Sequence, residues 1–145
     1  MPYKCLITLL AMILSLVACG QKPQRSASNT SIHKTEQTMD LSKITNEQAR
    51  QAIEAWQQGD STSFLSFFVA NARLTDDGHP RDFANFVKTA CGHERFTSID
   101  KVENNGLDIY GNFHTESWGD FRTFFKFQLG KKGKFERLDI GQAKY

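Results

Sequence analysis

Five polar side chains have the chemistry needed for proton transfer, and all of them lie in the second half of the chain. Four belong to segments with strand character and the fifth precedes a predicted helix: Asp100, Tyr110, His114 and Asp139, and His79. A carboxyl or imidazole group enclosed by apolar side chains has a shifted pKa, which can suit it to acid–base chemistry. The direction in which each strand presents its side chain therefore decides whether a catalytic group exists.

The alternation of apolar and polar residues predicts those directions. Tyr110 and His114 alternate with an apolar set, so they face away from the core if that set is buried. The apolar set is Leu107, Ile109 and Phe113. Asp139 alternates with Leu138 and Ile140 in the same way and is expected to face outward. Asp100 instead shares the strand parity of Phe96 and Val102, so it could point inward; the alternative is a solvent-exposed position. No local motif around these residues matches a catalytic signature, so no catalytic residue is predicted.

Composition and spacing argue against several other classes of function. Lys+Arg 18 against Asp+Glu 16 is nearly balanced and no basic stripe is present, so nucleic-acid binding is not expected. His79, His93 and His114 are scattered without a short ligand spacing, so no metal site is predicted. No phosphate loop, dinucleotide fingerprint or nucleophile elbow occurs, and no cofactor is expected.

The first residues have the pattern of an export signal. Lys4 gives a short basic start, and the apolar run Leu6–Val17 suits the hydrophobic region of a signal peptide better than a membrane span. The run ends in Leu16-Val17-Ala18-Cys19, which resembles the lipobox of bacterial lipoproteins. That resemblance implies a diacylglycerol on Cys19, cleavage before it and acylation of its new amine, and several acyl chains anchor a protein stably.

The sequence divides into three regions on this basis. Residues 1–18 are the predicted signal peptide, residues 19–40 the lipidated Cys19 and a polar, disordered tether, and residues 41–145 the folded domain. Gly20 follows the cysteine where an Asp commonly signals inner-membrane retention, so we expect an outer-membrane protein that faces the periplasm. Cys91 is then the one thiol left in the mature chain, and we interpret it as a buried small side chain at a helix end.

One strand organises the predicted domain. The stretch Phe121–Leu129 places Phe125 and other apolar residues on one face and Arg122, Lys126 and Gln128 on the other. Phe124 lies among the polar residues, which indicates a partly covered second face and therefore a central strand.

The rest of the domain is predicted to be α+β. Apolar stripes with helical spacing predict three helices, with starts at the Thr45 capping box, at Asp60 or Ser61, and at Pro80. The second helix is predicted to extend through Phe68. A period of two then predicts about four main strands in an antiparallel meander, after a brief extended segment at residues 72–75.

The order of these pieces resembles a SnoaL-like domain of the nuclear transport factor 2-like (NTF2-like) superfamily. The residues that carry the resemblance are Trp56, Gly59-Asp60, Phe64, Phe67, Ala72, Asp77-Gly78 and the final segment Gly133–Ile140, within a span from Thr45 to Ala143. The resemblance implies a cone, in which a curved antiparallel sheet wraps three helices around a pocket. It also implies that the protein could form a homodimer through the outer sheet face. The superfamily contains enzymes and non-catalytic binding proteins, so the fold alone does not choose between them.

The expected pocket residues combine aromatic and polar side chains. They are Trp56, Phe68, His79, Phe86, Asp100, Tyr110, His114 and Phe125. Trp118 lies in a turn and is either a contact for a partner protein or part of the core. The sequence therefore favours a lipid-anchored periplasmic module that binds a small apolar ligand or an envelope protein without catalysis. The alternative is an isomerase or hydrolase that uses a pocket carboxylate with a Tyr or His.

Overall fold

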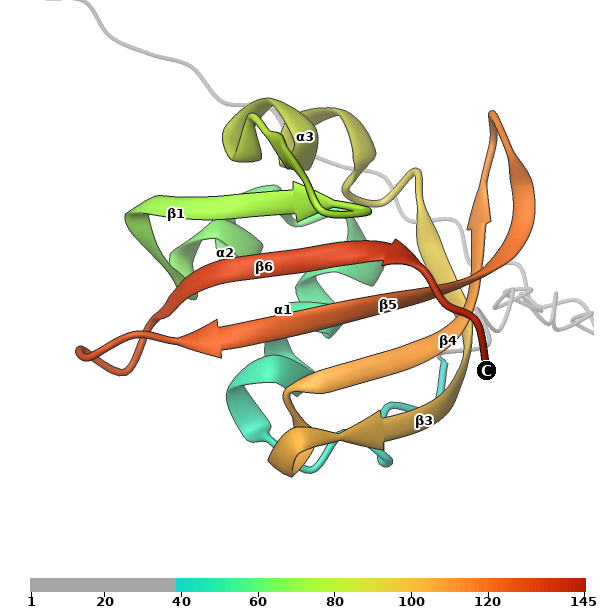
Figure 1. The fold of residues 1–145 in the computed structure, drawn as a ribbon, viewed down its shortest axis with the longest axis horizontal. Helices are drawn as coiled ribbons and strands as arrows, with labels where there is room; N and C mark the ends of the chain where they lie inside the picture. The colour runs from blue at the N-terminus through green and yellow to red at the C-terminus, as the bar shows by residue number, and fades with distance from the viewer. Residues whose placement is uncertain (1–38) are drawn as a thin grey trace, which may run out of the picture. The chain divides into compact units, whose positions relative to one another are not determined.

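The computed structural model describes residues 39–145, so the predicted signal peptide, Cys19 and the tether up to residue 38 lie outside the described residues. The described part is an α+β domain with a curved, open sheet (Figure 1). Its helices are α1 (Glu47–Gln58), α2 (Ser61–Ser66), α3 (Phe83–Ala90) and the short 3-10 turn η1 (Asn104–Gly106). Its strands are β1 (Phe68–Asp76), β2 (His79–Arg81), β3 (Arg95–Glu103), β4 (Asp108–Thr115), β5 (Gly119–Leu129) and β6 (Phe135–Gln142). No helix within residues 39–145 is long and apolar enough to cross a membrane.

The sheet has six strands in the order β2-β1-β6-β5-β4-β3, two more than the sequence pattern predicted. The difference lies at one edge, where the expected brief segment is the nine-residue strand β1 and its hairpin partner β2. The prediction of a purely antiparallel sheet was also wrong, because β1 pairs with β6 in parallel. Strands distant in sequence leave no local pattern that reveals their relative direction, so this pairing was not accessible to periodicity.

Strand β5 occupies the central position that its sequence predicted. It lies between β4 and β6, and Thr123, Phe125 and Phe127 are buried toward the helices. Phe124 is half-buried on the opposite face, as expected for a strand with both faces partly covered. The alternation along β5 thus fixes which side of the sheet holds the core.

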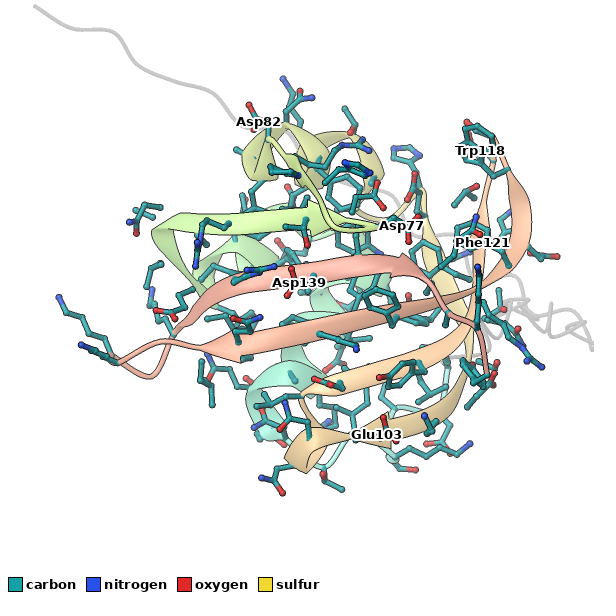
Figure 2. All side chains as sticks on the ribbon, in the orientation of Figure 1. Asp77, Asp82, Glu103, Trp118, Phe121 and Asp139 are labelled. Carbon is teal, nitrogen blue, oxygen red and sulfur yellow. The ribbon has the colours of Figure 1, made fainter. Side chains whose placement is uncertain are left out.

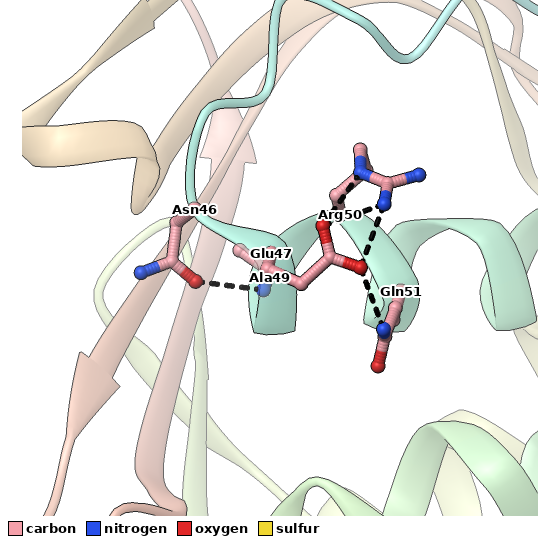
Figure 3. Close-up of polar contacts among 5 residues, drawn as sticks. All are labelled: Asn46, Glu47, Ala49, Arg50 and Gln51. Atoms are coloured by element: carbon pink, nitrogen blue, oxygen red, sulfur yellow. Dashed lines mark hydrogen bonds and ion pairs between the residues drawn. The ribbon is translucent and has the colours of Figure 1, made fainter.

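The helices begin at side-chain caps. Asn46 accepts a hydrogen bond from the Ala49 backbone N–H at 2.9 Å, so α1 starts one residue later than the predicted cap at Thr45 (Figure 3). Asp60 caps α2 in the same way, as predicted. Gly59 ends α1 with φ 74°, a left-handed conformation that favours glycine.

Two boundaries near α2 and α3 differ from the prediction. Helix α2 ends at Ser66, and Phe68 begins β1, where its ring is buried against Phe64 and Phe135. Pro80 lies in β2 rather than at the start of α3, and Asp82 caps α3 through the Asn85 N–H at 2.9 Å. Proline suits this short edge strand because it needs no backbone donor on its free side.

The core is an aromatic cluster between the helices and the concave face of the sheet. Trp56 of α1 is fully buried and packs against Phe64, Phe86 and Phe125 with ring centroids 5.1–5.6 Å apart. Offset and edge-on pairs of this kind contribute beyond their buried area. Helices α1 and α2 lie behind the sheet in Figure 1 and α3 lies beside its β1 edge, so one face of the sheet carries the core.

Candidate functional site

A cavity of about 330 Å³ lies between the concave face of the sheet, α3 and the β1–β2 hairpin. Its apolar wall comes from α3 and from the central strands, through Phe86, Phe113, Phe121, Phe125 and Ile140. Aromatic rings at these positions follow from the alternation of β4 and β5, whose inward residues include Phe113, Phe121, Phe125 and Phe127. The strands therefore present an apolar surface to any molecule in the cavity.

Glu94 is a half-buried charged residue in this wall. It follows α3, its backbone N–H donates to the Ala90 carbonyl at 2.8 Å, and its own carbonyl accepts from Trp56 Nε1 at 2.6 Å. Both backbone groups are therefore fixed to the helices. The carboxylate itself makes no hydrogen bond or ion pair with any residue in 39–145. Glu94 lines the cavity with a rigid main chain and an unpaired carboxylate.

Burial is the main cause of the raised pKa of the Glu94 carboxyl. Partial burial raises the pKa of the Glu94 carboxyl above its usual 4.5, and the nearby carboxylate of Asp76 raises it further. The guanidinium of Arg81 opposes both effects. The cavity thus disfavours the ionised form of Glu94 when no additional cation is present.

The mouth of the cavity is polar. Arg81 Nη1 and Asp76 Oδ2 form an ion pair at 2.7 Å, and the Arg81 guanidinium lies 5.9 Å from the ring centroid of Phe86. Asp77 follows in the β1–β2 turn, where its carboxylate accepts the Gln142 N–H at 2.9 Å (Figure 2). A two-residue turn of this type needs positive φ at both positions, and Asp77 and Gly78 have φ 47° and 83°.

Two buried threonines line the same space, and both use their hydroxyl groups internally. Thr123 Oγ1 donates to the Gly141 carbonyl at 2.8 Å, and Thr115 Oγ1 accepts from the Trp118 N–H at 2.9 Å. The second bond holds the turn between β4 and β5, the hairpin that extends from the sheet in Figure 1. The Trp118 side chain at its tip is 82% exposed and yet borders the cavity (Figure 2).

The aromatic residues expected in the pocket divide between the core and the cavity. Trp56 and Phe68 are packed in the core and do not border the cavity, whereas Phe86 and Phe125 form part of its wall. His79 is exposed on β2 and does not line the cavity.

The polar strand residues lie on the convex face, away from the cavity. Tyr110 lies under the Lys101 ammonium, which is 4.5 Å from its ring centroid, and His114 Nδ1 lies 2.6 Å from Asp120 Oδ1. Asp139, on the same face (Figure 2), accepts from Arg137 Nε at 2.7 Å. The outward positions follow from the alternation of β4 and β6.

Asp100 is exposed, so of its two expected directions the inward one was wrong. Its carboxylate accepts a hydrogen bond from the Tyr145 hydroxyl at 2.8 Å. The register of β3 against β4 shifts twice, between Phe96 and Ser98 and between Ile99 and Lys101. Each shift inserts a residue and reverses the parity of those that follow.

The sequence pattern did not identify Glu94 or the Asp76–Arg81 pair as site residues. Glu94 comes directly after His93, and the adjacent pair carries no spacing signal. The carboxylate reaches the cavity only because the chain after α3 is turned by Gly92 at φ 81° and held by Trp56. The one local signal for this site was Gly92, a glycine at the end of a helix and two residues before the polar Glu94.

A larger depression of about 1020 Å³ lies at the edge strand β3 and is lined by α1 and residues 39–43. The backbone groups at this edge are already bonded. Gln57 both donates to the Phe96 carbonyl and accepts from its N–H at 2.9 Å, and Lys43 Nζ donates to the Ile99 carbonyl at 2.7 Å. The smaller cavity is the better candidate site because aromatic rings form its wall, whereas polar and charged side chains form most of the lining of the larger depression. Among residues 39–145, no three His, Cys, Asp or Glu side chains are grouped so that they could hold a metal ion.

Comparison with solved structures identifies the fold. An NTF2-like protein from Cytophaga hutchinsonii has a TM-score of 0.53 and 10% identity over 72% of this chain and 91% of that one. A protein from Kribbella flavida whose name proposes it to be a ketosteroid isomerase has a TM-score of 0.55 and 12% identity, covering 70% of this chain and 79% of that one. The described domain has the NTF2-like fold. No protein-family model and no curated protein matches the chain.

The same fold also occurs as part of a larger protein. The orange carotenoid protein of Anabaena, in a structure binding canthaxanthin, has a TM-score of 0.54 and 16% identity over 67% of this chain. The match covers 35% of that protein. At these identities the likeness concerns the fold alone, and it assigns no residue a role.

Proposed function

We propose that this chain is a lipid-anchored binding module of the bacterial cell envelope whose cavity receives a small apolar ligand. The observation that carries the proposal is the cavity of about 330 Å³ with Phe86, Phe113 and Phe125 in its wall. Small-molecule sites are concave and mostly apolar, contain a few polar groups, and start at roughly 300 Å³. The cavity is therefore large enough for a molecule of about the size of a small aromatic or terpenoid compound.

The names of two structural neighbours support an apolar ligand. One binds canthaxanthin and the other is named for a ketosteroid, and both names refer to largely apolar molecules. Such ligands agree with the phenylalanine-rich wall of the present cavity. A ligand of this kind gains free energy in proportion to the apolar area that it removes from water.

Binding is favoured over catalysis by the groups beside Glu94. The described lining contains no tyrosine or histidine that could act with this carboxylate, because Tyr110 and His114 lie on the convex face. The Thr123 hydroxyl donates its proton to the Gly141 carbonyl, and the Thr115 hydroxyl oxygen accepts from the Trp118 N–H. The pair of groups expected for an isomerase or hydrolase is therefore not assembled in the cavity.

A contact with an envelope protein is the second candidate function. It is favoured by Trp118, an aromatic side chain that is 82% exposed at the tip of the β4–β5 hairpin. Exposed tryptophans contribute strongly when they are buried at interfaces. Loss of cross-linked partners on Trp118→Ala, in a protein that remains folded, would support this second function.

The location in the envelope depends on Cys19 and is tested by fractionation. We expect the wild-type chain in the outer-membrane fraction and Cys19→Ser in the soluble fraction, because the acyl chains supply the anchor. Cys91→Ser serves as the matched control and should remain in the membrane. Membrane retention of Cys19→Ser would refute the lipid anchor.

The cavity is tested by native mass spectrometry of the whole chain, extracted from membranes in a mild detergent. We expect a bound small molecule that is lost in Ile140→Trp, because Ile140 borders the cavity and the larger ring fills it. Gln128→Trp adds the same ring on the exposed face of β5 and should leave the complex intact. A bound mass that survives Ile140→Trp in a folded protein would place the ligand elsewhere.

A further inference from the structure

The charges around the cavity are unequal, and this imbalance specifies the class of ligand. Asp76, Asp77 and Glu94 contribute three carboxylates to the lining and Arg81 contributes a single guanidinium, so the formal charge of the described lining is −2. The argument that follows rests on the function proposed above, since it concerns the ligand of that same cavity.

Two of the three carboxylates have a partner within the domain. Asp76 is paired with Arg81 at 2.7 Å, and Asp77 accepts the backbone N–H of Gln142 at 2.9 Å. Glu94 has neither a hydrogen bond nor an ion pair among the described residues, although it is half-buried between aromatic rings. A carboxylate removed from water without a partner is unfavourable, and a cation close to it relieves that cost.

The wall of the cavity is also suited to a positive charge. The faces of aromatic rings attract cations electrostatically, most strongly when the site is partly desolvated. Phe86, Phe113, Phe125 and the exposed Trp118 surround the space next to Glu94. The domain already places one cation in this way, because the Arg81 guanidinium lies over the Phe86 ring at 5.9 Å from its centroid while pairing with Asp76.

These observations agree on one ligand chemistry. We propose that the cavity binds an organic cation, an amine or quaternary ammonium group on an apolar body, with the positive group beside Glu94 and the apolar body against the phenylalanine wall. An anionic ligand of the same shape would meet three carboxylates, and a neutral ligand could at most donate a hydrogen bond to Glu94 and would leave its charge uncompensated. The cation therefore accounts for both the apolar and the charged part of the lining.

The experiment compares three probes that each have a phenyl group on a four-carbon chain and differ in the charge of the end group: phenylbutylamine, phenylbutanol and phenylbutyrate. The full chain is placed in zwitterionic lipid nanodiscs, and binding is measured by calorimetry with empty nanodiscs as the blank. We expect phenylbutylamine to bind at least roughly tenfold more tightly than phenylbutanol, which corresponds to about 1.4 kcal/mol. Phenylbutyrate should bind most weakly.

Glu94→Gln tests the residue that carries the selectivity. This change keeps the shape of the side chain and removes its charge, so it should weaken phenylbutylamine roughly tenfold and leave phenylbutanol within about twofold. Glu136→Gln is the matched control, since Glu136 is exposed on β6 and does not line the cavity. Its affinities should equal those of the wild type.

The outcomes separate this proposal from the general binding function. Equal or tighter binding of phenylbutanol or phenylbutyrate would overturn the cation proposal and leave a binding cavity in place. Amine selectivity that persists unchanged in folded Glu94→Gln would also overturn it. If none of the three probes binds, both the cation proposal and the small-ligand function fail.

Discussion

Replacement of Phe125 by alanine tests whether the aromatic wall of the cavity is also the structural core. The ring is 1% exposed and packs against Trp56, Phe96 and Phe113 with centroids 5.4, 5.0 and 5.6 Å away. Truncation of a buried phenylalanine costs about 3–5 kcal/mol. Because one side of this ring faces the cavity and has fewer packing partners there, we expect a loss near the lower end, about 3–4 kcal/mol.

The neighbouring residue supplies a matched control on the same strand. Phe124 presents the same side chain to the convex face, where it is half-buried near Tyr110 and Lys126. Cross-strand contacts of this kind contribute roughly 0.2–1 kcal/mol, so Phe124→Ala should cost about 1 kcal/mol. The two variants remove the same atoms and differ only in the face of the sheet.

The assay is urea denaturation followed by circular dichroism, supported by thermal melts. For a domain of about 100 residues, the expected loss in Phe125→Ala lowers the melting temperature by roughly 12–20 °C. Equal destabilisation by the two variants, or a loss below about 1 kcal/mol in Phe125→Ala, would mean that the concave face is not the core.

Three further results are expected. In Gly111→Ala the new Cβ would lie 1.9 Å from the Ser98 backbone oxygen, so β3 and β4 must separate and the free energy of unfolding should fall by at least about 2 kcal/mol. Gly133→Ala is the control: it has open space around it and should lower the free energy of unfolding by about 1 kcal/mol. Equal losses in the two variants would contradict this explanation. Burial raises the pKa of the Cys91 thiol to about 11, so peptide mapping after native thiol labelling near neutral pH should find Cys91 unmodified until the protein is unfolded. The pKa of Glu94 is raised on folding, so its ionised form destabilises the ligand-free domain. Glu94→Gln should therefore increase the free energy of unfolding at about pH 7 and have little effect at about pH 4, where the carboxyl is protonated in both states. A stabilisation that persists at the lower pH would show that charge is not the cause.

The sequence predicted well those features that depend on local periodicity. The alternation along β4 and β5 assigned the buried face of the sheet, and Asp77-Gly78 and Asn104-Asn105, residue types that favour turns, lie at positive φ. In each case a single strand or turn contains the whole signal. Such features require no knowledge of which strands become neighbours.

Features that depend on distant pairing were missed or placed wrongly. The parallel contact of β1 with β6 joins residues more than sixty positions apart, as in Leu74 opposite Leu138. The first register shift in β3, between Phe96 and Ser98, reversed the parity on which an inward position for Asp100 depended, and the second shift restored it by Val102. Bulges of this kind add curvature to a sheet, and the pattern of apolar residues in one strand does not reveal them.

The candidate site was hidden from sequence reasoning for the same reason. Periodicity finds residues that obey a strand or helix pattern, whereas Glu94 lies between α3 and β3 and belongs to neither. Its position follows from long-range contacts: the Trp56 indole holds its carbonyl, and the β1–β2 hairpin brings Asp76 and Arg81 to the opposite side of the cavity. Among the three carboxylates that line the cavity, the one that a regular pattern cannot explain is thus the one without a hydrogen bond or ion pair, and a ligand that supplies a positive charge would complete its interactions.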